Sequence, residues 1–219
     1  MSELNGPMVE ARSGERGSLV ILLHGYGADG NDLIGLAGPL GGALSETEFV
    51  SPNAPQPCTM NPMGRQWFPI PYLDGSTEQA MREGMGYSVA ALDAFIDAET
   101  ARTGLPANRV ALMGFSQGTM MSLHVGLRRG EELAGIVGFS GRLLDPEVLP
   151  DEIRSKPPVL LVHGTADPVV PFDSMALAEE GLEGAGVPVQ SIARPGLGHG
   201  IDERGMVAAA QFLMQRLSA

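Results

Sequence analysis

A serine between two glycines is the first candidate for chemistry in this chain. Residues 114–118 (GFSQG) follow the apolar run 110–113 and precede a helical pattern that begins at Gln117. In a strand–turn–helix setting, such a serine is held on a strained turn with its hydroxyl accessible, and the glycines leave room for nearby backbone. Because Gly supplies 30 of the 219 residues, the pattern alone could mark an ordinary turn. Its setting predicts a nucleophile at Ser116.

Two other residues offer weaker nucleophiles. Ser140 lies in a similar segment, 138–142 (GFSGR), but Arg142 replaces the second glycine and no convincing helix follows. We interpret Ser140 as a strand-end serine near the site. Cys58, the one cysteine, lacks the strand–turn–helix setting and is expected to be a small loop residue rather than a catalytic thiol.

A serine hydroxyl needs a neighbouring base, and the chain has four histidines. His199 lies in 196–200 (GLGHG), between the last expected strand and the last expected helix, where glycines let a loop carry an imidazole over the sheet edge. His124 falls inside the helix after Ser116, so we expect it to pack or to face solvent. His163 ends a strand and is expected to be structural, and His24 belongs to a glycine-rich loop. These positions favour His199 as the base.

A carboxylate must orient that base. Asp167 follows the strand that ends at His163, and the carboxyl ends of parallel strands are where α/β proteins build sites. Asp173 is nearby but is expected to cap the next helix. Ser116, Asp167 and His199 each follow a separate strand, in the chain order expected of an α/β-hydrolase.

An oxyanion formed at Ser116 needs backbone donors. One is expected from the N–H of Gln117 and the other from the loop after an early strand, for which 22–27 (LLHGYG) is suited. The alternative is a nucleotide-binding loop, because 25–30 also reads G-x-G-x-x-G. We disfavour it because no helix is expected to begin tightly within the motif. No acidic residue clearly ends a second strand about 20 residues later either.

The elements that must position these residues alternate along the chain. Apolar, β-rich runs separated by amphipathic segments predict an α/β fold with a mostly parallel central sheet flanked by helices. Strands are expected at 8–12 and 19–23, as a hairpin, and at 48–50, 110–113, 133–139, 158–162 and 188–192. Helices are expected from Asn31, which would cap its own helix, over 77–102, from Gln117, and over 206–217.

Two connecting segments bear on access to the site. Residues 140–157 are too short for a cap domain with its own core. Residues 51–75 form a long stretch of the kind that is often functional, and Met60, Met63 and Trp67 could line a partial wall there, with core packing as the alternative. We therefore expect an open, shallow site.

Composition limits the remaining classes. A length of 219 residues fits one domain, 1–219, and a net charge of −12 disfavours nucleic acid and anionic membranes as partners. One cysteine allows no internal disulfide, which fits a reducing cytosol. No apolar run is long enough for a membrane span, and residues 1–7 lack a secretory pattern. A cytoplasmic protein without stable membrane insertion is expected.

Taken together, these motifs resemble the phospholipase/carboxylesterase family of α/β-hydrolases, which includes bacterial carboxylesterases and acyl-protein thioesterases. The resemblance spans nearly the whole chain in the family's order and is carried by 23–30 (LHGYGADG), 52–55 (PNAP), 67–68 (WF), 114–118 (GFSQG), 163–171 (HGTADPVVP) and 198–199 (GH).

The resemblance implies a serine carboxylesterase for short-chain esters, with thioesters or lysophospholipids as further substrates, no metal or organic cofactor, and a possible homodimer. Acyl-protein thioesterase, a peptidase or dienelactone-type hydrolase, and a non-catalytic binding protein on the same fold are alternatives. Pro69, where thioesterase relatives commonly have an acidic residue, and Thr119, where many relatives have another small residue, depart from the family pattern.

Residue roles also follow from the resemblance. Trp67 would lie near the active-site mouth, although a large aromatic could equally pin the long loop onto the core. The other implied roles are nucleophile for Ser116, acid for Asp167, base for His199, and backbone oxyanion donors for Leu23 and Gln117.

Overall fold

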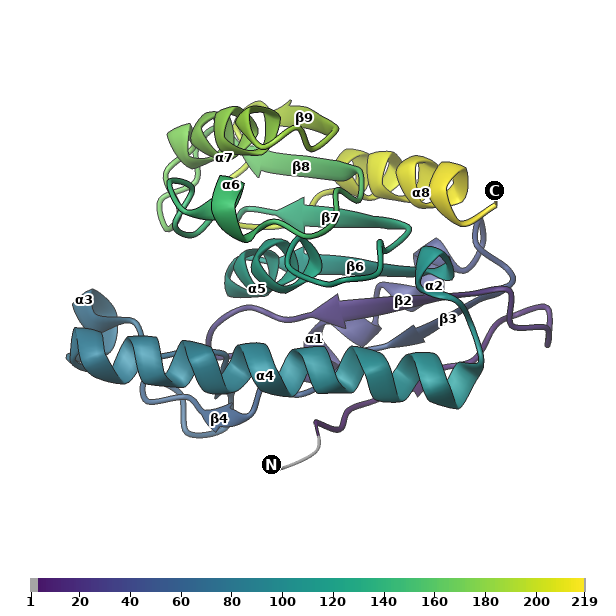
Figure 1. Cartoon of the computed structure of the whole chain (residues 1–219), viewed down its shortest axis with the longest axis horizontal. Helices are drawn as coiled ribbons and strands as arrows, with labels where there is room; N and C mark the ends of the chain where they lie inside the picture. Colours follow the sequence, from purple (N-terminus) through teal and green to yellow (C-terminus); the bar gives the residue numbers. More distant parts are fainter. Residues whose placement is uncertain (1–3, 219) are drawn as a thin grey trace.

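The computed structural model describes residues 4–218, so the first three residues and the last residue of the expected 1–219 domain lie outside it. Within that range a seven-stranded sheet has the order β1-β3-β2-β6-β7-β8-β9 (Figure 1). Every neighbouring pair is parallel except β1 with β3. The strands are β1 (Met8–Val9), β2 (Ser18–Leu23), β3 (Thr47–Val50), β6 (Val110–Phe115), β7 (Gly135–Phe139), β8 (Val159–Gly164) and β9 (Val189–Arg194). The predicted single-domain α/β fold is confirmed.

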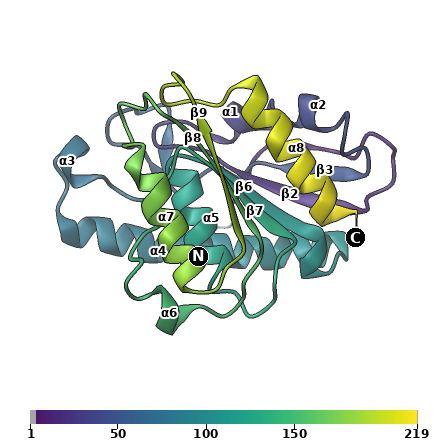
Figure 2. The same ribbon diagram turned by 90° about the horizontal axis from the view of Figure 1, so that it is seen from above.

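Helices cover both faces of the sheet (Figure 2). One face carries α4 (Glu78–Thr103), α5 (Gln117–Gly126) and α7 (Asp173–Gly184), and the other carries α1 (Gly30–Ile34), α2 (Ala37–Leu40) and α8 (Glu203–Leu217). Shorter elements are the hairpin of β4 (Gln56–Pro57) and β5 (Arg65–Gln66), α3 (Pro71–Asp74), α6 (Leu149–Glu152) and the 3₁₀ turn Ala107–Arg109. No helix in the described part of the chain is long and apolar enough to cross a bilayer.

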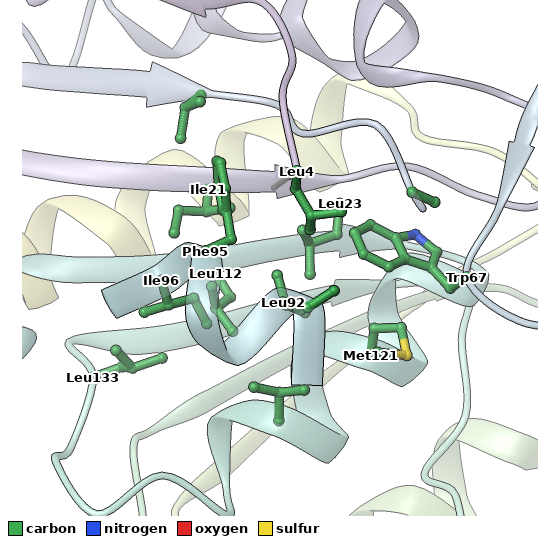
Figure 3. Packing of buried hydrophobic residues seen from close by; sticks show 14 of the residues in the cluster. Leu4, Ile21, Leu23, Trp67, Leu92, Phe95, Ile96, Leu112, Met121 and Leu133 are labelled. Atoms are coloured by element: carbon green, nitrogen blue, oxygen red, sulfur yellow. The ribbon is translucent and has the colours of Figure 1, made fainter. Parts of the chain in front are cut away.

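The core explains why the strands read as continuous apolar runs. Every residue of β2 is buried, since successive side chains enter the two opposite layers. Ile21 and Leu23 pack with Leu92 of α4, as Figure 3 shows, whereas Leu22 packs in the layer that contains Phe212 of α8. The sheet is therefore fixed from both sides, which holds the ends of its strands in place.

The expected hairpin at the N-terminus is wrong. Strand β1 pairs antiparallel with β3, with Met8 opposite Val50, and not with β2. The turn before β2 is hydrogen-bonded to the residues just before β3: Ser13 N–H donates to Ser45 O, and Gly17 N–H donates to Glu46 O. Backbone pairing with a strand farther along the chain thus replaces the local hairpin.

Helix ends are partly as expected. Thr77 caps α4 by accepting from Ala80 N–H (3.1 Å), which confirms its start. The cap of α1 is Asp29 and not Asn31, because the Asp29 carboxylate accepts from Asn31 N–H at 2.8 Å. Asp173 is the first residue of α7 and does not cap it; Phe172 occupies the cap position.

The two long connections differ. Residues 140–157 contain only the four-residue helix α6, in agreement with the absence of a cap domain. Residues 51–75 contain the β4–β5 hairpin and α3, so this segment has more structure than the sequence indicates. It lies beside the end of β6, where the candidate nucleophile is found.

Candidate active site

Ser116 lies on the sharp turn between β6 and α5. Its φ of 54° and ψ of −116° are strained for a residue with a side chain. The turn is held by a 2.8 Å hydrogen bond from Ser116 N–H to Phe139 O. The flanking glycines are required by contact: a Cβ on Gly118 would lie 1.8 Å from Leu23 O, and one on Gly114 would lie 2.4 Å from the backbone of Gly118. This is the geometry predicted for a nucleophile elbow.

Asp167 and His199 are brought together from separate loops. His199 Nδ1 lies 2.8 Å from Asp167 Oδ2. The Asp167 side chain is fully buried, and its Oδ1 accepts from the N–H groups of Val169 (2.8 Å) and Val170 (3.0 Å). Burial alone would raise the pKa of Asp167, but the hydrogen bonds from His199, Val169 and Val170 outweigh it and hold that pKa below its ordinary value. Asp167 is therefore a charged acceptor that fixes the imidazole.

The imidazole of His199 lies beside the elbow. Its ring contacts that of Phe115, with centroids 4.8 Å apart, and its side chain is 17% exposed. Within residues 4–218, no hydrogen bond joins Ser116 Oγ to His199. The Asp167 carboxylate accepts a hydrogen bond from Nδ1–H of His199. The Nε2 lone pair of His199 therefore stays available to take a proton.

The backbone donor expected at Leu23 stays a prediction. Leu23 is the last residue of β2, fully buried, and its register partner in the sheet is Gly114. The chain reaches the serine only beyond this strand: a Cβ on Gly25 would lie 3.4 Å from Ser116 Cβ. Tyr26 N–H, one residue farther on, has no acceptor among the described residues. This loop thus contacts Ser116 at Gly25, two residues beyond Leu23.

Gln117 begins α5 directly after the serine, so its N–H is unused by the helix. Its side chain has a role that the sequence did not predict: Oε1 accepts from Trp67 N–H and Nε2 donates to Phe68 O, both at 2.8 Å. These two bonds join the elbow to the segment after β5 across about fifty residues of sequence.

Trp67 is a core residue and not a residue of the mouth. Its side chain has no exposed surface, packs beside Leu23 and Met121 (Figure 3), and donates from Nε1 to His24 O at 3.0 Å. The structure therefore corrects its expected place as a substrate-binding residue. It shows the alternative, in which the indole pins the long loop onto the core.

The competing serine and histidines take other roles. Ser140 directly follows β7, is buried, and is followed by no helix until α6. His24 Nδ1 lies 2.8 Å from Gly25 O while Nε2 accepts from Ala54 N–H, and burial lowers its pKa. His124 lies within α5, where burial, followed by the charge of Arg128, lowers its pKa to about 4. His163 is buried beside Asp167.

Thr119, a departure from the family pattern, is explained by its surroundings. Its Oγ1 lies 2.8 Å from both Gly114 O and Phe139 O. A Cβ on Gly138 or on Gly141 would come within 2.5 Å of Thr119 side-chain carbons. The glycines around Ser140 thus make room for Thr119, which accounts for their resemblance to an elbow motif.

The nucleotide-binding alternative fails on contact. Helix α1 does begin at Gly30, the last glycine of the spacing, contrary to expectation. However, a Cβ on Gly30 would lie 2.1 Å from Ser51 O, and Gly27 N–H donates to Arg65 O. Neighbouring protein backbone packs directly against these glycines and occupies the space that a phosphate would need. Among residues 4–218, no group of three or more His, Cys, Asp or Glu is placed to hold a metal ion.

A cavity of about 270 Å³ opens between the elbow helix and the loop after Asp167. Met60 and Met63, expected in its wall, are instead exposed and line no part of it. Polar or charged groups enter it from Tyr72, Glu78, Arg142 and Ser174; its apolar wall is formed by Phe68, Ile70, Pro71, Met81, Met120, Val169, Val170 and Pro171.

Comparisons with known proteins agree with this geometry. A profile described as phospholipase/carboxylesterase matches residues 4–217. Acyl-protein thioesterase 1 of Gibberella zeae is 32% identical to this chain, covering 96% of it and 95% of the relative. Esterase PE8, known from a crystal structure, is 44% identical in sequence to this chain and superposes on it with a TM-score of 0.93. The match covers 99% of this chain and 100% of the other. Acyl-protein thioesterase 2 of Zea mays is 25% identical with a TM-score of 0.77, covering 97% and 99%.

Proposed function

Because the chain belongs to the phospholipase/carboxylesterase family of α/β-hydrolases and is therefore an ester hydrolase, we propose that it cleaves short-chain carboxylic esters with Ser116, His199 and Asp167. The observation that carries the proposal is the 2.8 Å Asp167–His199 contact beside a serine on a strained strand–helix turn. No part of the proposal requires a metal or an organic cofactor.

The mechanism begins with proton transfer. Nε2 of His199 takes the Ser116 proton as Oγ attacks the ester carbonyl, and the Asp167 carboxylate stabilises the imidazolium that forms. This step needs Nε2 to reach Oγ, and such hydrogen bonds tighten once substrate is bound. The tetrahedral oxyanion is held by the N–H of Gln117 and, in place of Leu23, by that of Tyr26.

Breakdown completes the cycle. The oxyanion collapses, the C–O bond of the ester breaks, and His199 gives its proton to the leaving alcohol. Water then attacks the Ser116 acyl-enzyme with His199 as base, releasing the acid and restoring the serine. The acyl group would occupy the cavity that Met120 of the elbow helix α5 helps to line.

A covalent trap tests the proposal directly. Incubation with a fluorophosphonate should add one phosphonyl group to the chain, and digestion followed by mass spectrometry should place it on Ser116. Loss of ester hydrolysis should follow the same time course as labelling. Full labelling on another residue, or full labelling with activity intact, would remove Ser116 from the mechanism.

Acyl-protein thioesterase activity is the second candidate, and it is favoured by the names of relatives at 32% identity over most of the chain. The position that is commonly acidic in thioesterase relatives holds Pro69, which packs against α4: a Cβ on Gly84 would lie 2.8 Å from Pro69 Cδ. We therefore rank simple esters first. Matched oxygen and sulfur esters of the same acid, compared by kcat/KM, decide between the two.

Partners and compartment extend the proposal. We infer a small-molecule ester as substrate and a reducing, cytoplasmic location, supported by the free, buried thiol of Cys58. The net charge of −12 disfavours nucleic acid. A homodimer is carried over from the family resemblance, and sedimentation of the purified protein measures it.

Acyl-chain length should limit turnover. The cavity of about 270 Å³ is smaller than most ligand sites, which begin at roughly 300 Å³. We expect kcat/KM for p-nitrophenyl esters to be highest for short acids and to fall by about tenfold or more for long ones. Long-chain triglycerides should be poor substrates, without activation at a lipid–water interface. A rate that jumps when substrate passes its solubility limit contradicts this expectation.

The pH profile should report the base. Ester hydrolysis should fall as pH decreases through the range in which the base becomes protonated, because a protonated imidazole has no lone pair to offer. Since the pKa of Asp167 lies below its ordinary value, the carboxylate stays charged throughout this range and is lost only at lower pH. The acid limb of kcat/KM should therefore show one proton. A rate that stays level from about pH 8 to 5 argues against a histidine base.

A further inference from the structure

We propose that His163 is a positioning residue of the triad, which fixes the Asp167 carboxylate and limits the negative charge that this carboxylate presents to His199. The inference deepens the proposed function and rests on its assignment of Asp167 and His199. It gives a chemical role to a histidine that the sequence indicates only as a strand-end structural residue.

The geometry fixes which nitrogen of His163 carries a proton. His163 lies in β8, and its side chain is 1% exposed. Its Nε2 is 2.9 Å from Val170 O and 3.3 Å from Asp167 Oδ2. Because both neighbours are acceptors, Nε2 is the protonated nitrogen; its N–H donates to Val170 O and also lies close to Asp167 Oδ2. The ring is held further by edge contact with Phe172, at a centroid distance of 6.0 Å.

Asp167 is thereby surrounded by donors. Its Oδ1 accepts from Val169 and Val170, and its Oδ2 faces His199 on one side and His163 on the other. Val170 also participates twice, since its N–H donates to Asp167 and its carbonyl accepts from His163. The carboxylate, its loop and the second histidine therefore form one closed network.

Removal of the His163 donor has an electrostatic consequence. N–H groups close to a carboxylate offset its charge, so fewer of them leave more negative charge facing the remaining partner. A more strongly negative Asp167 favours the imidazolium form of His199. The pH midpoint of His199 protonation should then rise. A purely structural role for His163 would change the stability of the protein but not this midpoint.

Other charged groups around the network stay the same in the comparison. Arg194 lies on β9, the strand beside β8, and pairs at 2.8 Å with Asp202 at the start of α8. Arg142 and Glu78 line the cavity together with Val170. Since all four remain unchanged in every variant, a difference between variants reports the donor at position 163.

The test compares His163→Leu with His163→Gln. Leucine keeps apolar volume but has no donor, whereas the glutamine amide places an N–H near the position of Nε2. With four histidines in the chain, NMR can follow the imidazole C–H signal of His199 in a pH titration. We expect the midpoint to rise by about half a pH unit or more in His163→Leu and to stay within about 0.2 unit of the unsubstituted protein in His163→Gln.

Equal midpoints in all three proteins, or equal shifts in both variants, would overturn the inference. If His163→Leu does not fold, His163→Asn replaces it, because the shorter amide falls short of Asp167 and should shift the midpoint in the same direction. In an Asp167→Asn background, the His163 substitution should cause no further shift. The titration needs no substrate, so failure of the proposed esterase activity is scored separately, by hydrolysis of the ester panel.

Discussion

Replacing Ser116 with alanine should abolish ester hydrolysis while leaving the fold intact. Removing the nucleophile of a serine–histidine–carboxylate triad costs on the order of a million-fold in kcat, because the remaining donors stabilise a transition state that no longer forms efficiently. Ser116 is only 8% exposed, and its backbone makes the hydrogen bond to Phe139 that alanine would keep. Activity and the thermal midpoint of unfolding should be measured on the same sample.

Ser140→Ala is the matched control. Ser140 is a buried serine on the neighbouring strand end and also has a positive φ, 48°. Its hydroxyl takes no part in the proposed chemistry, so this variant should keep substantial activity. Loss of hydrolysis in Ser140→Ala together with near-normal rates in Ser116→Ala would move the nucleophile to β7.

Asp167→Asn should produce the second-largest loss, about ten-thousand-fold in kcat with a much smaller change in KM. An asparagine amide that donates toward His199 favours the imidazole tautomer with its proton on Nε2, where the base must be unprotonated. Folding should be less affected, since the amide oxygen still accepts from Val169 and Val170. Rates over a series of ester concentrations separate kcat from KM.

Asp173→Asn serves as the comparison for that loss. Asp173 is the first residue of α7, six positions along from Asp167, and it neither caps the helix nor contacts His199. Its amide should leave kcat within about twofold of the unsubstituted protein, as expected for a surface change away from the reacting atoms. A comparable loss in both variants would indicate a general effect of charge on this loop.

The sequence is sufficient to predict the parallel strands of the sheet and the contact between Asp167 and His199. The parallel strands inside the sheet are buried on both faces, so they read as apolar runs, whereas the edge strand β9 is only partly buried. The residues that follow the parallel strands meet at one edge of the sheet. Ser116 is identifiable because its strand–turn–helix setting is local, although Gly118 is required by contact with Leu23 O of β2. Local patterns of this kind can be recognised from the sequence alone.

What was missed depends on contacts between distant segments. The pairing of β1 with β3 is made by backbone groups, which carry no residue signature. Burial of Trp67 depends on the carbonyl of His24, which its indole N–H reaches across 43 positions. The contact of the 22–27 loop with Ser116 lies at Gly25, because β2 continues through Leu23. None of these three facts follows from composition or spacing.

The double hydrogen bond of the Gln117 amide to Trp67 and Phe68 has an evolutionary consequence. Substitution of Gln117 would leave a buried N–H and a buried C=O unpaired at once, so drift at this position is restricted even though its side chain takes no part in bond breaking. Length changes in the 51–75 insertion are correspondingly restricted next to residues 67–68. They are tolerated more easily at the β4–β5 tip, where Met60 and Met63 are exposed. New substrate preferences in descendants of this enzyme should therefore arise by changes beyond Phe68, around α3, while the part anchored to the elbow stays constant.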